Sequence, residues 1–351
     1  MAEQLRRRAP GGIGTYARAL VDRIPDVTLW ASRGAPLGPR MATSPLPSRA
    51  LVLAWDRGVC GPPAGFDVVH APSLAVPPRP GEGVPLTVTV HDLAWRRAPE
   101  TFPSRGRRWH DAALRRALDR ATAFVVPSPA TADDLVAAGA PPQRVAVIEE
   151  GCDHLPAPDL SGAARLRARL GVGEDYLLTA STLEPRKNLG RLAAAYAAAS
   201  APASPATGRH GPLPPLVVVG PRGWGADLRP EDGVVLAGPV APAVLAGLYA
   251  GARLFVSVPL VEGFGLPVVE AMACGAPVIA SPVPSAGGAA YEVDPTDTAA
   301  IAEALVRVCF DGGRRDELIA RGRARAAALT WASAAARHRD LWESLGARAA
   351  G

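Results

Sequence analysis

The sequence predicts an α/β protein built from two Rossmann-like, doubly wound domains. Short apolar segments alternate with alanine-rich segments of helical length along the whole chain, which is typical of parallel sheets with helices on both faces. A chain of 351 residues is long enough for two domains that each have a core. Prolines among small polar residues at 154–160 indicate a linker. We therefore expect domains at 1–157 and 158–330, and a terminal helix at 331–351 that packs back toward the first domain.

Each expected element follows from this alternation. In the first half we expect strands at 27–31, 51–54, 67–70, 86–91, 123–127 and 145–149, and helices at 14–23, 105–120 and 130–138. In the second half we expect strands at 176–180, 216–220, 234–237, 254–258 and 278–280, helices at 189–199, 242–250, 267–274 and 298–310, and a surface loop at 200–215. A buried strand should precede the first glycine-rich turn of such a domain. Residues 3–8 are polar and basic, so we expect that strand to be missing or truncated.

The composition is that of a soluble globular protein, with 48% hydrophobic and 20% charged residues. No run approaches the ~18 apolar residues that a membrane helix requires. Pro10, Gly11 and Gly12 stand where a signal peptide would need its apolar stretch. We therefore expect a cytoplasmic protein, whose net charge of +5 allows peripheral association with the inner face of a membrane.

Several classes of site are disfavoured. The four cysteines are widely spaced and form no C-x-x-C pair, so neither a zinc site nor a disulfide framework is expected. Aromatic residues make up 5% of the chain and no nucleic-acid-binding module is recognisable, so no nucleic-acid partner is expected. No D-x-D sequence occurs, and a metal held by paired aspartates is not expected either.

The most informative segment is 257–281, where two carboxylates flank a glycine-bearing turn. Glu262 and Glu270 lie on either side of the turn at 263–265, and Pro267 marks the first position of a helix. The N–H groups of the turn and the positive end of the helix dipole point into one space, which predicts an anion or sugar site. Glu270 lies in an apolar run, where an ionised carboxylate needs donors such as the hydroxyls of a polyol. The alternative is that Glu270 only complements the dipole and that Glu262 is solvated.

A second motif at 183–189 reads L-E-P-R-K-N-L and follows an expected strand. Asn188 is expected to cap the next helix, which places Arg186 and Lys187 at the positive end of that helix. The dipole disfavours each cation there by roughly 0.3–1 kcal/mol, so the arrangement predicts an anion among them. The alternative is a pair of solvated surface cations.

A third motif at 10–17 reads P-G-G-I-G-T-Y-A and nominally fits the dinucleotide fingerprint G-x-G-x-x-A. The signal is weak because the preceding strand is missing and because Ser32 and Arg33 stand where an acidic residue should end the next strand. Hydride chemistry therefore loses support. An ordinary tight turn is the alternative for Gly12.

His91 ends the strand expected at 86–91, and open α/β sheets bind ligands at the carboxyl ends of their strands. A histidine there can hydrogen-bond a sugar hydroxyl or steady charge near an anomeric carbon. A purely structural histidine is the alternative. His70 also follows a strand and is the reserve candidate, whereas a helix N-cap explains Ser128 more simply.

The pattern E-G-F-G-L-P-x-x-E-A-M-A-x-G-x-P-V in 262–278 resembles the signature of the retaining nucleotide-sugar glycosyltransferases of family four. These enzymes have the GT-B fold, in which two Rossmann-like domains face each other across a cleft. The resemblance implies that Glu262 approaches the donor hexose and that Glu270 binds the ribose hydroxyls. It assigns the hexose and phosphate oxygens to the amides of the turn, at Phe264, Gly265 and Leu266.

The same resemblance extends to the other motifs. It implies that Arg186 and Lys187 contact the donor diphosphate, that Gly12 lets the backbone approach diphosphate and acceptor, and that His91 approaches the hexose. It further implies a hexosyl transfer with retention to a glycan or lipid-linked sugar. The H-D-L and E-P-R-K-N contexts resemble those of mannosyltransferases that use GDP-mannose, and a UDP-sugar is the alternative donor. No cofactor is expected to be bound, and the departing phosphate is expected to take the proton of the acceptor.

Three alternatives remain at this point. A GT-B enzyme that hydrolyses or epimerises nucleotide sugars needs suitably spaced acid and base carboxylates. A non-catalytic nucleotide-sugar-binding protein is compatible with the missing first strand. A nicotinamide oxidoreductase is the least favoured.

Overall fold

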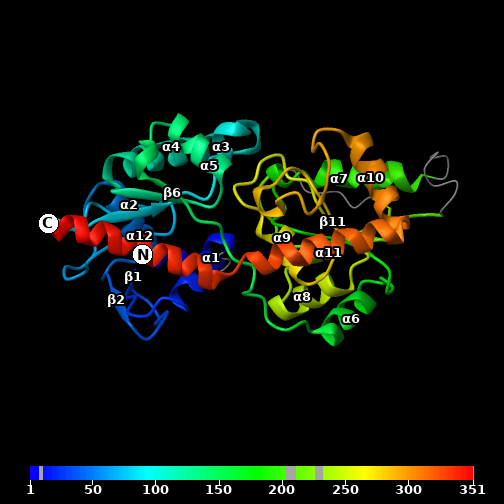
Figure 1. Ribbon diagram of the computed structural model, residues 1–351, viewed down its shortest axis with the longest axis horizontal. Helices are drawn as coiled ribbons and strands as arrows, with labels where there is room; N and C mark the ends of the chain where they lie inside the picture. Colours follow the sequence, from blue (N-terminus) through cyan, green and yellow to red (C-terminus); the bar gives the residue numbers. More distant parts are fainter. Residues whose placement is uncertain (8–10, 202–210, 226–231, 351) are drawn as a thin grey trace. The chain divides into compact units, whose positions relative to one another are not determined.

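The computed structural model describes residues 1–7, 11–201, 211–225 and 232–350, and it is an α/β protein with parallel sheets (Figure 1). Its contacts divide the chain into two compact units. Unit 1 contains Met1–Arg96, Pro103–His154 and the chain from Thr330 onward, and unit 2 contains Arg97–Phe102 and Leu155–Leu329. No helix among the described residues combines the length and the apolar content that crossing a bilayer requires.

Unit 1 is built on a four-stranded parallel sheet in the order β3-β4-β5-β6. Its strands are β3 (Val69–Ala71), β4 (Leu86–Thr89), β5 (Ala123–Val126) and β6 (Val145–Val147), and a separate parallel pair is formed by β1 (Leu29–Ala31) and β2 (Met41–Thr43). Its helices are α1 (Gly11–Val21), α2 (Ser48–Asp56), α3 (Ala94–Arg97), α4 (Ser104–Arg120), α5 (Pro129–Ala137) and α12 (Trp331–Ala350). The C-terminal helix α12 packs against α1, and the hydroxyl of Tyr16 on α1 lies 2.7 Å from Nε2 of His338 on α12.

Unit 2 is built on a six-stranded parallel sheet in the order β12-β11-β10-β7-β8-β9. Its strands are β7 (Leu177–Ala180), β8 (Leu216–Val219), β9 (Val234–Gly238), β10 (Leu254–Ser257), β11 (Val278–Ala280) and β12 (Tyr291–Glu292). Its helices are α6 (Leu160–Arg169), α7 (Leu189–Ser200), α8 (Pro242–Gly251), α9 (Leu266–Ala273), α10 (Thr298–Phe310) and α11 (Gly312–Ala328). Helices α7 and α10 pack on one side of the sheet, while α6 and α8 lie on the other (Figure 1).

The strand order of unit 2 brings the two most informative motifs together. Strands β7 and β10 are parallel neighbours, with Leu177 opposite Leu254. The segments that follow them, 181–188 and 258–265, therefore leave the sheet at the same edge. Short 3₁₀ helices occur at η1 (Glu3–Arg6), η2 (Pro99–Thr101), η3 (Pro142–Arg144), η4 (Pro185–Lys187) and η5 (Pro284–Ala286).

The prediction of a strand at 51–54 is wrong, because these residues lie within helix α2. Leu51 and Trp55 are both buried, four residues apart, and they pack with Trp30. A short apolar run such as L-V-L-A-W fits a buried strand and a helix equally well, and here the helical spacing of the buried residues prevails.

The sequence predicts that the strand before the first helix is missing or truncated, and among the described residues the short helix η1 occupies this position. Glu3 anchors it, since its buried carboxylate accepts hydrogen bonds from the Ser32 N–H at 2.9 Å and the Ser32 hydroxyl at 3.0 Å. Helices α3, α6 and α11 and strands β2 and β12 were not expected from the sequence. Of the predicted loop at 200–215, residues 202–210 lie outside the described part of the chain, and so does Pro10.

Candidate functional site

The cations of the L-E-P-R-K-N-L motif are paired with a carboxylate of the neighbouring segment. Lys187 Nζ lies 2.6 Å and Arg186 Nη1 lies 3.1 Å from Glu262 Oε2. Arg186 Nη2 also lies 2.9 Å from Glu184 Oε1. The side chains of Arg186, Lys187 and Glu262 are only 12–16% exposed, so the alternatives of solvated cations and a solvated Glu262 are wrong. Glu262 is thus an acidic partner of both cations, and the binding of a ligand anion among them stays a prediction.

Burial and the pairing shift the pKa values of these two carboxylates in opposite directions. Burial alone would raise the pKa of Glu262, but Lys187 and Arg186 outweigh it, and the pKa is held below its usual value. Glu262 therefore stays ionised at neutral pH and serves as a hydrogen-bond acceptor. Burial is the dominant influence on Glu184, and its pKa is raised despite the nearby Arg186.

Asn188 precedes helix α7 but does not cap it through its side chain, in contrast to the sequence expectation. It adopts a left-handed conformation with φ of 59°, which asparagine tolerates better than most residues. Its side-chain amide instead donates to the carbonyls of Val258, at 3.0 Å, and Pro295, at 2.7 Å. Asn188 thus ties the cationic turn to the carboxyl end of strand β10.

The turn before helix α9 is fixed by Ser285, a residue that the sequence did not single out. Gly265 occupies the N-cap position with φ of 100°, a conformation that favours glycine. The Ser285 hydroxyl donates to the Gly265 carbonyl at 2.9 Å, and the Ser285 N–H donates to the Phe264 carbonyl at 3.0 Å. Phe264 and Leu266 bury their side chains. Pro267 has no N–H group, and the Val268 N–H donates to the Gly265 carbonyl at 3.0 Å. The amides of Gly265 and Leu266, at the positive end of α9, are therefore the ones suited to bind an anion.

Glu270 is 8% exposed in helix α9, and it accepts a hydrogen bond from the Tyr249 hydroxyl at 3.1 Å. Tyr249 belongs to the adjacent helix α8. Burial, followed by the charge of Glu270, raises the pKa of Tyr249 well above its usual value, so the phenol remains a donor. From the sequence, a buried Glu270 is expected to need hydrogen-bond donors, and the Tyr249 hydroxyl is one such donor within the protein.

His91 lies just beyond β4 in unit 1 and is held through both ring nitrogens. Nδ1 lies 3.0 Å from Glu150 Oε1, and Nε2 lies 3.0 Å from the Pro72 carbonyl oxygen. Burial alone would lower the pKa of His91, but the hydrogen bond and the charge of Glu150 raise it above the usual value. Glu150 was not found from the sequence, although it follows β6 at the same edge of the sheet.

The remaining candidates of unit 1 have different environments. Gly12 is exposed in the first turn of α1, while the left-handed glycine of that turn is Gly11, with φ of 63°. His70 contacts the hydroxyls of Thr87 and Tyr16 in a buried cluster, and burial lowers its pKa well below the usual value. Ser128 caps α5 by accepting from the Thr131 N–H, as expected.

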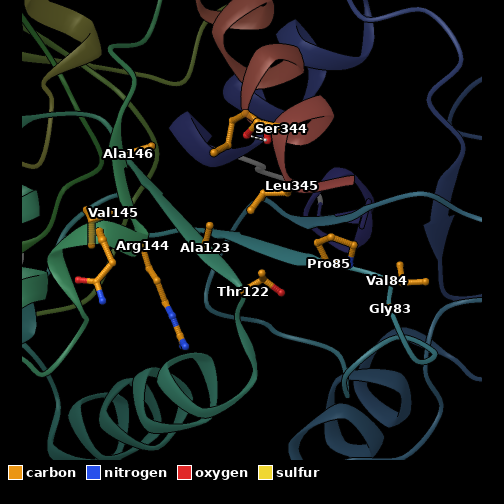
Figure 2. Close-up of a pocket in the computed structure, with 12 residues that line it drawn as sticks. Gly83, Val84, Pro85, Thr122, Ala123, Arg144, Val145, Ala146, Ser344 and Leu345 are labelled. Carbon is orange, nitrogen blue, oxygen red and sulfur yellow. Dashed lines mark hydrogen bonds between the residues drawn. The ribbon is translucent and has the colours of Figure 1, made fainter. Parts of the chain in front are cut away.

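A pocket of about 670 Å³ also lies in unit 1 (Figure 2). Its lining includes Pro85, Thr122 and Arg144, which directly precede strands β4, β5 and β6, and Leu345 of helix α12. It therefore opens at the amino ends of the strands, opposite to the edge that carries His91. Parallel α/β sheets bind ligands at the carboxyl edge, and we do not assign the donor to this pocket.

The predicted residues thus fall into two groups, one in each unit. Gly12 and His91 belong to unit 1. Unit 2 contains the charged group Arg186, Lys187, Glu262 and Glu270 and the turn residues Phe264, Gly265 and Leu266. Within unit 2, Glu262 contacts both cations directly.

Comparisons with known proteins point to one family. Residues 9–154 match the family model Glycosyltransferase Family 4, and residues 174–311 match the model Glycosyl transferases group 1. The O-antigen chain mannosyltransferase B of Escherichia coli is 30% identical over 286 residues, which cover 75% of this chain and 71% of that protein. The D-inositol 3-phosphate glycosyltransferase of Acidothermus cellulolyticus is 31% identical over 275 residues, which cover 71% of this chain and 59% of that protein.

The fold is also shared with solved structures. The crystal structure of Anabaena Alr3699/HepE in complex with UDP-glucose matches this chain with a TM-score of 0.64 and 21% sequence identity. The match covers 84% of this chain and 81% of that one. This likeness shows the fold, which is GT-B with two Rossmann-like domains. Together with the sequence matches over both halves, it establishes that the chain belongs to the family 4, group 1 glycosyltransferases.

Proposed function

We propose that this glycosyltransferase moves a mannosyl residue from GDP-mannose to a hydroxyl group of a glycan or lipid-linked acceptor, with retention and without a metal ion. The observation that carries the proposal is the cluster of Arg186, Lys187 and Glu262 at the carboxyl edge of the unit 2 sheet. The E. coli relative is named as a mannosyltransferase, which supports mannose as the transferred sugar. A UDP-sugar is the alternative donor, since UDP-glucose is bound in a structure of the same fold.

Arg186 and Lys187 would bind the diphosphate of the donor. As the glycosidic bond breaks, negative charge grows on the β-phosphate oxygens, and cations that are already in place stabilise this charge. Glu262 keeps them in place, because it accepts hydrogen bonds from both. This arrangement replaces the divalent cation that other transferases hold with paired aspartates, and the departing phosphate would take the proton of the acceptor hydroxyl.

Glu262 would also orient the hexose as an acceptor of hydroxyl hydrogen bonds. Its lowered pKa keeps it ionised, which suits an acceptor and not a proton donor. Glu270, which is positioned by Tyr249, would bind the ribose hydroxyls. The amides of Phe264, Gly265 and Leu266 would bind the hexose and phosphate oxygens, while His91 would approach the hexose and Gly12 the diphosphate and acceptor.

A transfer assay tests this proposal. The purified protein is incubated with GDP-mannose or UDP-glucose and with a set of lipid-linked and free oligosaccharide acceptors, with and without EDTA. We expect transfer from GDP-mannose that EDTA does not reduce, and a product with the anomeric configuration of the donor. Free mannose without any acceptor product would instead indicate a hydrolase. Donor binding without turnover would indicate a binding protein.

The same preparation tests membrane association, which a lipid-linked acceptor would require. We expect the basic protein to co-sediment with vesicles that contain anionic lipid and not with neutral vesicles. Equal sedimentation with both kinds of vesicle would contradict an electrostatic association.

A further inference from the structure

The His91 ring is fixed at both of its nitrogens by groups from two other segments of unit 1. Glu150, which follows strand β6, places Oε1 at 3.0 Å from Nδ1, and Pro72, which follows β3, places its carbonyl oxygen at 3.0 Å from Nε2. The side chain of Glu150 is 5% exposed and that of His91 is 17% exposed. Both partners are thus part of a built site and not of a mobile surface contact.

The identity of these partners decides the protonation of the ring. A carboxylate and a main-chain carbonyl only accept hydrogen bonds, so the ring must donate from both nitrogens. A neutral imidazole has one N–H group, whereas the imidazolium has two. The contacts therefore select the positively charged form of His91.

The groups that face His91 from other elements agree with this assignment. Asp92 favours the positive charge, and the ring of Tyr16 from α1 meets His91 edge-on with the ring centroids 4.8 Å apart. Two further histidines lie near, His70 on β3 and His338 on α12. Burial is the main reason why the pKa values of both are lowered, that of His338 to about 4, and the charge of His91 adds to the effect. They are neutral at physiological pH and leave the charge on His91.

We propose that Glu150 is a positioning residue of the transfer reaction, which holds His91 as a doubly hydrogen-bonded imidazolium at the carboxyl edge of the unit 1 sheet. The inference rests on the proposed function, in which His91 approaches the donor. Its consequence is that His91 has no lone pair with which to accept a proton and does not act as a general base. Its ring has a fixed orientation and a positive charge that is paired with the Glu150 carboxylate, and the proposed function brings the donor hexose to this ring.

The first test is a histidine titration by NMR on the full chain without donor or acceptor. The His91 signal is assigned by its loss in His91→Gln. We expect the wild-type His91 pKa to lie above its usual value, and Glu150→Gln to lower it by about 1 to 3. Glu150→Asp retains the charge and should keep the pKa raised. Glu82→Gln, the same substitution at an exposed loop position of unit 1, is the matched control and should leave it unchanged.

Two results of this titration would overturn the inference. One is a wild-type His91 that titrates at or below its usual pKa, a measurement that does not depend on any Glu150 variant. The other is an unchanged His91 pKa in a Glu150→Gln protein whose circular dichroism is native. Neither result depends on transferase activity, so the titration is separable from the proposed function.

The second test is the pH dependence of kcat/KM for the transfer. If the imidazolium is required, the rate should fall as the pH rises through the pKa of His91. This limb should move to lower pH in Glu150→Gln, by the same amount as the NMR pKa, and should stay in place in Glu82→Gln. A limb that does not move while the NMR pKa does would refute the role of Glu150 in the reaction. A wild type without any transfer would count against the proposed function and leave the titration result intact.

Discussion

Replacing Lys187 with methionine should separate the role of its charge from that of its aliphatic stem. The ammonium lies 2.6 Å from Glu262, and both side chains are 16% exposed. Breaking a buried ion pair costs about 3–5 kcal/mol when the remaining charge has no partner. Arg186 stays 3.1 Å from the same carboxylate oxygen. The loss should therefore be smaller, and we expect the free energy of unfolding to fall by about 1–3 kcal/mol.

The effect of Lys187→Met on turnover should exceed its effect on stability. A preorganised cation at the leaving diphosphate acts mainly in the transition state, and removal of one such group typically lowers kcat by about 100- to 1000-fold. The assay is the initial rate of transfer at saturating donor, combined with denaturant unfolding of the same preparations.

The control for Lys187→Met is the removal of an exposed cation far from this motif in the sequence. Lys187 is the only lysine of the chain, so the control is Arg49→Met, which removes an exposed cation from helix α2 of unit 1. We expect this control to retain wild-type turnover and stability. A folded Lys187→Met protein with wild-type turnover would refute the role of the ammonium in binding the diphosphate.

Three further predictions concern the same unit. Folding lowers the pKa of Glu262, so the contribution of this carboxylate to stability is present above its usual pKa of 4.5 and is lost as the pH falls through the lower folded value. The free energy of unfolding of the wild type should therefore decline more steeply below pH 4.5 than that of Glu262→Gln. Parallel curves for the two proteins would contradict this. Ser285→Ala removes the hydrogen bond to the Gly265 carbonyl, so stability should fall by about 1 kcal/mol and the KM for the donor should rise, whereas an unchanged KM would show that this contact does not shape the turn. Tyr249→Phe removes a buried hydrogen bond to Glu270, so the free energy of unfolding should fall by about 1.5–3 kcal/mol and the binding of a nucleoside diphosphate, measured by calorimetry, should weaken. Wild-type values for both would rule out a positioning role for Tyr249.

Much of the fold could be predicted from the sequence, because parallel strands that are covered on both faces are continuous apolar runs. The segments at 216–220 and 254–258 are of this kind, and both became central strands. The segment at 51–54 has the same composition but became part of a helix. The buried side chains of this helix pack against Trp30, which is distant in sequence. The local sequence therefore could not show that a helix, and not a strand, forms here.

The site shows the same division. The chemistry of Arg186, Lys187 and Glu262 could be predicted because each belongs to a local motif. Their mutual pairing could not, since it depends on β7 lying beside β10 in the sheet. Glu150 was missed for a similar reason, because strand order alone brings the residue after β6 to the edge that carries His91.

We propose that two cations and the amides of the turn before α9 hold the donor diphosphate without a divalent ion. A crystal structure of the protein with GDP-mannose, grown in the presence of EDTA, tests it most directly. We expect both phosphates to lie within hydrogen-bond distance of Arg186, Lys187 and the N–H groups of Gly265 and Leu266. A diphosphate bound away from these groups, or bound only when a divalent cation is supplied, would contradict it.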